Sequence, residues 1–243
     1  MNVSPSTIQN ENFSQRQKFN LPSYTLTEEI MNSVTHGLGI IFSIIAYVLL
    51  LMKGNYTPTN LACITICCST LFVLYTVSTL YHALKAGKAK AIFRKFDHCS
   101  IFLLIAGTYT PLCTMYIKGP FATAVLIGVW ITAIVGIVLN AIDVNKFSKI
   151  SLACYIIMGW SVVFMAKSVF ESLSSKQLSY LLAGGIFYTV GAALYVVGKK
   201  IRYMHSIWHL FVLAGSILHF FIIYWYITQG EYIQKMKKTK LYI

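Results

Sequence analysis

Charged side chains are scarce in this sequence of 243 residues. Only 20 residues are Lys or Arg and 7 are Asp or Glu, together 11% of the chain. Soluble domains usually carry about a quarter of their residues as charged side chains, so this number cannot cover the surface of a soluble domain of this size. The hydrophobic fraction is 57%. The composition excludes a secreted enzyme, a disordered chain and a nucleic-acid-binding domain, despite a formal net charge of +13.

Signals of secretion and of disulfide bonding are lacking too. None of the six cysteines forms a CxxC pair, and all lie within or just inside apolar runs, so we expect reduced thiols. Residues 1–30 lack the apolar core of a cleavable signal peptide. The apolar runs also lack the period-2 alternation of a membrane barrel.

Long uncharged apolar runs are abundant instead. A helix crosses the ~30 Å hydrocarbon core of a bilayer with about 20 residues. We therefore predict an all-α membrane protein, a seven-transmembrane helix bundle, with a flexible N-terminal tail (1–27), a membrane domain (28–227) and a basic C-terminal tail (228–243). The seven predicted spans are 31–52, 61–83, 98–117, 121–140, 150–166, 178–198 and 205–227.

The basic residues between these runs predict the orientation. Of the 20, 12 fall on the side of the N-terminus and 4 on the opposite side, with 4 more in the C-terminal tail. Positive loops stay in the cytoplasm. We therefore expect a multi-pass protein of the cell (plasma) membrane with a cytoplasmic N-terminus and an extracellular C-terminus, although the basic tail KMKKTK argues weakly against the latter.

Ionisable residues within spans are costly and commonly functional. All six histidines lie in the predicted spans or at their edges. The predicted topology brings five polar residues of three spans to one depth near the cytoplasmic face. They are Ser78 and His82 at the end of the second span, Asp97 at the start of the third, and His205 and His209 at the start of the seventh.

The spacing of these residues suggests a metal site. Ser78 and His82 are one helical turn apart, as are His205 and His209, so each pair shares a helix face. Two imidazoles one turn apart can chelate a metal ion, and a third makes the three-ligand set of catalytic zinc sites. Asp97 could then act as a base, and Ser78 could position water or a substrate carbonyl.

Simpler interpretations remain open at each position. A His pair can serve as interhelical hydrogen-bond partners, Ser78 can bond its own helix, and Asp97 can cap the third span. His219 lies about 15 Å beyond His209 along a helix and cannot share its ion. We expect three further residues to support the site rather than bind the metal: Asn32, His36 and His98.

The same residues carry a family resemblance. The segments that carry it are EEIMNSVTHGLG (28–39), STLYH (78–82), FDHCSIFLLIAGTYTPL (96–112) and HSIWH (205–209). They resemble the hemolysin III family, the bacterial branch of the progestin and adipoQ receptors, which is related to adiponectin receptors. The resemblance covers about residues 28–227. It implies seven helices, a cytoplasmic N-terminus, zinc held by His82, His205 and His209, and Asp97 holding the water on the zinc.

Three functions compete. The first is a zinc-dependent hydrolase acting on an amide or ester of a lipid, with an acyl chain inside the bundle. The second is a non-catalytic sensor or regulator of membrane homeostasis with structural zinc, although a closed structural site usually has a fourth protein ligand. The third, cytolysis through a pore, is disfavoured because the sequence offers no ring of charge. We expect membrane lipids as partners, homo-oligomers as an option, and no nucleic acid.

Overall fold

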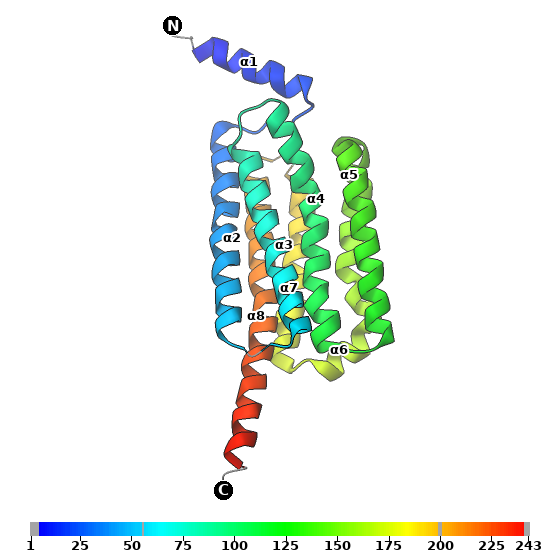
Figure 1. Ribbon diagram of the computed structural model, residues 1–243. Helices are drawn as coiled ribbons and strands as arrows, with labels where there is room; N and C mark the ends of the chain where they lie inside the picture. Colours follow the sequence, from blue (N-terminus) through cyan, green and yellow to red (C-terminus); the bar gives the residue numbers. More distant parts are fainter. Residues whose placement is uncertain (1–4, 55, 199–200, 241–243) are drawn as a thin grey trace.

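The computed structural model describes the backbone of residues 5–54, 56–198 and 201–240. It describes the side chains of residue 11 and of residues 13–54, 56–198 and 201–228. All regular structure in these ranges is helical, as predicted (Figure 1). The elements are α1 (Pro5–Lys18), α2 (Leu26–Met52), α3 (Pro58–Ala83), α4 (Lys88–Pro111), a π-helical turn η1 (Leu112–Tyr116), α5 (Pro120–Trp160), a 3₁₀ turn η2 (Ser161–Met165), α6 (Ala166–Ser172), α7 (Ser175–Val197) and α8 (Met204–Lys240).

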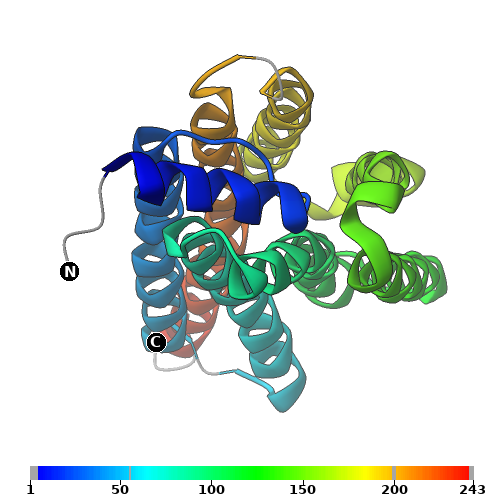
Figure 2. The same cartoon turned by 90° about the horizontal axis from the view of Figure 1, so that it is seen from above.

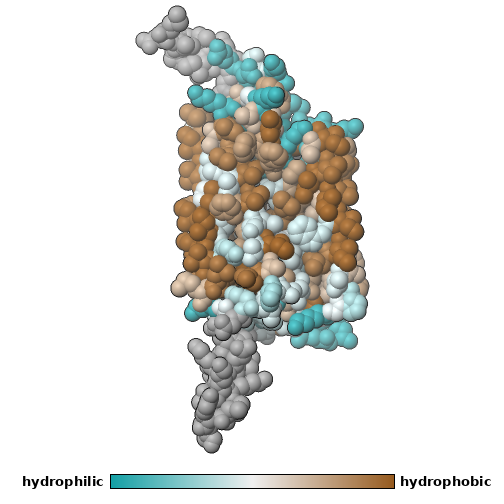
Figure 3. Space-filling model, in the orientation of Figure 1, coloured by the Kyte–Doolittle hydropathy of each residue, from teal (hydrophilic) through white to brown (hydrophobic). Residues whose placement is uncertain are grey.

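Six stretches of the described chain are long and apolar enough to cross a membrane. They are α2, α3, α4 with η1, the stretch Pro120–Ser172, α7, and Met204–Thr228 of α8. Their outer faces carry large exposed apolar side chains, such as Ile41, Ile134 and Phe164. On the face seen in Figure 3, a brown hydrophobic band lies between two teal ends. The chain is therefore a multi-pass membrane protein.

The count of spans differs from the predicted seven at one place. The runs 121–140 and 150–166 both fall within Pro120–Ser172, a single apolar stretch of 53 residues. Its helix α5 is broken at Asp143, whose φ of −154° and ψ of 104° are not helical. The Asp143 carboxylate accepts hydrogen bonds from the amides of Asn145 and Lys146, which is how a residue caps the start of a new helix. Two arms of α5 therefore lie side by side in Figure 2.

The predicted N-terminal tail contains a helix. We expected residues 1–27 to form a flexible tail, and within them Pro5–Lys18 form α1 and Leu21 is buried after it. Arg16, counted in the sequence only as a loop charge, pairs with Glu29 of α2. At the other end of the chain, α8 continues to Lys240. Residues 1–4 and 241–243 of the predicted tails, and Lys199 and Lys200, lie outside the described residues.

Close helix contacts hold the part of the bundle that carries the histidines. Gly39 of α2 faces the ring of Tyr75 on α3, where a Cβ atom would lie 2.3 Å from the ring. The Tyr75 hydroxyl donates to Ser216 Oγ of α8 at 2.7 Å. A small residue that admits a large ring in this way is typical of helix contacts in membranes. It fixes α2, α3 and α8 against each other.

Candidate metal centre

Three histidines from two helices lie together at the end of the bundle near α1, the upper end in Figure 1. His82 belongs to the last turn of α3, and His205 and His209 to the first two turns of α8. One ring nitrogen of each lies within 4.8 Å of the others. The residues are 2%, 8% and 0% exposed. Among the described residues, these three make the group of His, Cys, Asp or Glu that could hold a metal ion.

The two nitrogens of each ring can play different roles. The Nε2 atoms of all three histidines are buried and have no hydrogen-bond partner. The Nδ1 atom of His82 lies 2.8 Å from Glu29 Oε2, and that of His209 lies 3.1 Å from the Asn32 carbonyl oxygen. A neutral imidazole that donates through one nitrogen presents a lone pair on the other, and this is the state in which histidine binds metals. The donor set therefore fits a metal ion such as zinc.

Glu29 connects this group to two cations. Its Oε1 atom lies 3.0 Å from Arg16 Nη2 and 3.1 Å from Lys90 Nζ. Lys90 is 1% exposed, and it donates to carbonyls at the end of α3 and just after it, at Tyr81, His82 and Leu84. Carbonyls at the end of a helix lack partners within that helix. The buried Lys90 ammonium group thus gives hydrogen-bond partners to the carbonyls at the end of α3, and it holds Glu29 beside His82.

The residues predicted to support the site have different surroundings. Asn32 is buried, accepts a short hydrogen bond from Ser206 through its side chain and contacts His209 through its carbonyl. The ring of His36 stacks on that of His209, with 3.5 Å between centroids and 13° between planes. The ring of His98 packs edge-on against that of Tyr195, with 6.4 Å between centroids. The supporting roles of these three residues stay predictions.

The two residues predicted to act on a substrate are not members of the three-histidine group. Ser78 is one turn before His82 on α3, and it is buried. Asp97 lies buried on α4 and is not a member of the three-histidine group. A carboxylate outside the ligand set is free to act on other molecules.

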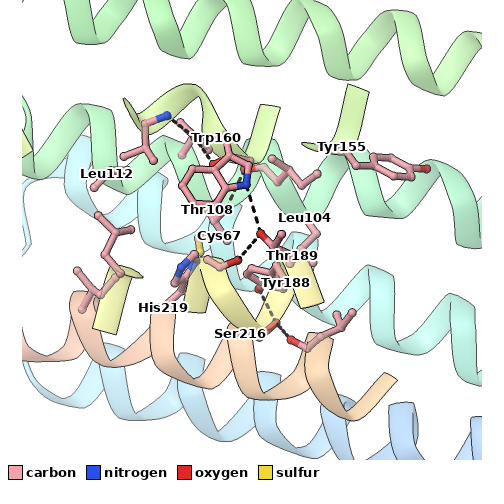
Figure 4. Close-up of a pocket in the computed structure, with 18 of the residues that line it drawn as sticks. Cys67, Leu104, Thr108, Leu112, Tyr155, Trp160, Tyr188, Thr189, Ser216 and His219 are labelled. Atoms are coloured by element: carbon pink, nitrogen blue, oxygen red, sulfur yellow. Dashed lines mark hydrogen bonds between the residues drawn. The ribbon is translucent and has the colours of Figure 1, made fainter. Parts of the chain in front are cut away.

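Two hollows meet near Asp97. The first, which we call the vestibule, has a volume of about 580 Å³, and Asn20–Thr25, Asn145, Arg202 and His205 line parts of its wall. The second, the apolar cavity, has a volume of about 350 Å³ and extends between α3, α4, α5, α7 and α8. Figure 4 draws residues that line it, and there the Trp160 indole donates to the Thr189 hydroxyl. Four residues line both hollows: Asp97, His98, Tyr195 and Trp208.

Sequence reasoning missed one aromatic residue of the centre. The ring centroid of Tyr24 lies 5.8 Å from that of His82 and 5.0 Å from that of His205. Burial raises the pKa of the Tyr24 phenol well above its usual range, so the hydroxyl keeps its proton near neutral pH. Tyr24 precedes the first apolar run, and no spacing rule linked it to histidines far along the chain.

Comparisons with known proteins cover almost the whole helical bundle. The family described as "Haemolysin-III related" matches residues 24–220. The chain is 41% identical to "Hemolysin-3" of Bacillus cereus over 202 residues, which are 82% of this chain and 92% of that protein. It is 39% identical to the "Hemolysin-3 homolog" of Bacillus subtilis (strain 168) over 212 residues, 86% and 99% of the two chains. It is 27% identical to the "Monocyte to macrophage differentiation factor" of Homo sapiens over 167 residues, 66% and 68% of the two chains.

Proposed function

The chain belongs to the haemolysin-III related family, and we propose that it is an integral membrane zinc protein that hydrolyses an amide or ester bond of a lipid. One observation carries the proposal. Three buried imidazoles present unpartnered Nε2 atoms close to where a polar vestibule meets an apolar cavity. The partners are then membrane lipids, whose acyl chain the apolar cavity accepts.

Zinc is the ion that suits these ligands best. Catalytic zinc sites commonly have three protein ligands and keep one position open, and neutral imidazole binds at ~2.0–2.1 Å. The contact between Glu29 and His82 is of the kind that orients a ligand and raises its basicity. When bound, zinc polarises a carbonyl and lowers the pKa of a water molecule to about 7.

The chain's own residues supply the rest of the chemistry. Asp97 accepts a proton from the attacking water, because a carboxylate outside the ligand set remains available as a base. The buried Ser78 hydroxyl donates to the substrate carbonyl. The acyl chain lies in the apolar cavity, and water enters through the vestibule.

A second candidate is a regulator of membrane homeostasis in which zinc is structural. The chain of contacts from Arg16 through Glu29 to His82 favours it, because these contacts link the N-terminal segment to the metal centre. A structural zinc site usually has four protein ligands, whereas the described residues provide three. We therefore rank hydrolysis first.

Cytolysis is suggested by the printed name of the Bacillus cereus relative, and no contact described above supports it.

We further propose seven membrane crossings in the plasma membrane, with the N-terminus in the cytoplasm and the C-terminus outside. The break at Asp143 supports this number, because 53 helical residues would extend about 80 Å, more than twice the hydrocarbon core. A thiol reagent applied to intact cells should label a cysteine introduced at Ser174 and not one at Gly87. The reverse pattern would contradict the orientation and the cytoplasmic position of the metal centre.

The hydrolase is tested with purified protein in lipid vesicles. We expect about one zinc per chain, and release of fatty acid from a fatty-acyl amide or its ester counterpart that stops when zinc is chelated and returns when zinc is added. His82→Ala, His205→Ala and His209→Ala should lose both zinc and hydrolysis. His219→Ala, at a half-buried histidine farther along α8, is the matched control for metal binding and should keep the zinc. A His209→Ala variant that retains zinc and hydrolysis would contradict the proposal.

A further inference from the structure

The segment between α1 and α2, Phe19–Thr25, crosses the end of the bundle that holds the metal centre; we call it the strap. Figure 2 shows α1 across this end and the chain turning back from it toward α2. The turn is made at Asn20, whose φ is +49°. The Asn20 amide donates to the Gln17 carbonyl and the Leu21 amide to the Arg16 carbonyl. This pair of bonds ends a helix with a left-handed residue, a conformation that asparagine tolerates.

The strap covers the histidines from the side of the vestibule. Its residues Asn20–Thr25 form part of the vestibule wall. The Tyr24 ring stands over His82 and His205, with centroids 5.8 Å and 5.0 Å away. His205 lines the vestibule and not the apolar cavity, whereas His36 lines the apolar cavity and not the vestibule. The strap therefore borders one of the two routes to the centre.

Two arginines hold the strap in this position. Arg94 of α4 donates from Nη1 to the Asn20 carbonyl and from Nη2 to Asn145 Oδ1, both at 2.8 Å. Arg16 donates to the Pro22 carbonyl and also pairs with Glu29. The Arg94 bonds are exposed, and segments held by exposed hydrogen bonds with few buried apolar contacts open locally at low cost in free energy. Leu21 and Tyr24 are the strap's main apolar contacts with the bundle.

We propose that the strap is a lid on the aqueous entrance of the metal centre, with Tyr24 as its cover and Arg94 as its latch. Closed, it narrows the vestibule over His82 and His205, which are 2% and 8% exposed. Open, it admits water-soluble reactants and releases water-soluble products, while lipids use the apolar cavity. The purpose of the lid rests on the proposed function, but its opening does not require zinc.

The test measures access to single histidines in metal-stripped protein. Diethyl pyrocarbonate modifies neutral imidazoles, and mass spectrometry locates the product. Arg94→Ala should raise the modification rate of His205 up to about fivefold, because an exposed contact of a charged group contributes up to about 1 kcal/mol. The rate at His36 should not change. Lys95→Ala is the matched control, since the neighbouring Lys95 donates to the Ala141 and Ile142 carbonyls and not to the strap. Arg94→Lys should restore part of the protection.

Two results would overturn the lid. One is an unchanged His205 rate in Arg94→Ala, and the other is an equal rise at His36, which would indicate general loosening. The zinc content of protein that has not been stripped of metal is measured in parallel. It distinguishes failure of the lid from failure of the proposed function. Selective exposure of His205 in a protein that binds no zinc would support the lid and contradict the hydrolase. Bound zinc with no change at His205 would contradict the lid alone.

Discussion

Asp97→Asn is expected to remove most hydrolysis while zinc stays bound. The substitution preserves the size of the side chain and leaves His82, His205 and His209 in place. It removes the carboxylate charge that, in the proposed function, accepts a proton during attack on the carbonyl. General-base catalysis of this kind contributes typically about 10²–10⁴-fold in rate, and we expect a loss in that range. Burial of Asp97 on α4, outside the ligand group, is the structural basis of this separation.

The measurement pairs zinc content with the hydrolysis rate in the same preparation. Ser78→Ala is the comparison, and it should reduce the rate less, because it removes one hydrogen bond and leaves the base intact. If Asp97→Asn keeps zinc and the full rate, Asp97 is not the base. The regulator with structural zinc then becomes the better explanation of the centre.

Lys90→Met is expected to cost a large part of the stability of the chain. The ammonium group is buried, pairs with Glu29 at 3.1 Å and donates to three carbonyls at the end of α3. Removing one partner of a buried ion pair typically costs about 3–5 kcal/mol. We expect about 3 kcal/mol, near the lower limit, because Arg16 continues to pair with Glu29.

Thermal unfolding in detergent tests this expectation. Lys88→Met is the matched control, since Lys88 lies on the same first turn of α4 and is exposed. It should leave the unfolding temperature nearly unchanged. If both substitutions shift unfolding equally, Lys90 contributes only as a surface charge, and its role in holding Glu29 beside His82 would be wrong.

The helical membrane bundle was predictable because long apolar runs have few other solutions in a protein with so little charge. The proximity of His82 to His205 and His209 followed from the depth of each residue in its span. The number of spans did not follow as directly. The break at Asp143 lies inside a continuous apolar stretch, and it depends on local bonds to Asn145 and Lys146.

The surroundings of the histidines were predicted less well. Lys90 and Arg16 were read as orientation charges, because a basic residue next to a span usually contacts water or lipid head groups. Their burial and pairing with Glu29 arise from tertiary packing between α1, α2 and α4. Tyr24 was missed for the same reason, since it reaches His82 and His205 only when the strap folds over the bundle.

X-ray absorption at the zinc edge tests the metal centre most directly. For the purified wild-type protein we predict four ligands at ~2.0–2.1 Å, three of them imidazole nitrogens and one a water oxygen. The signal should be lost in His209→Ala and kept in His219→Ala. A sulfur ligand at about 2.3 Å, or a fourth imidazole such as His36, would contradict an open three-histidine site. Absence of zinc from protein purified without chelators would contradict the metal centre altogether.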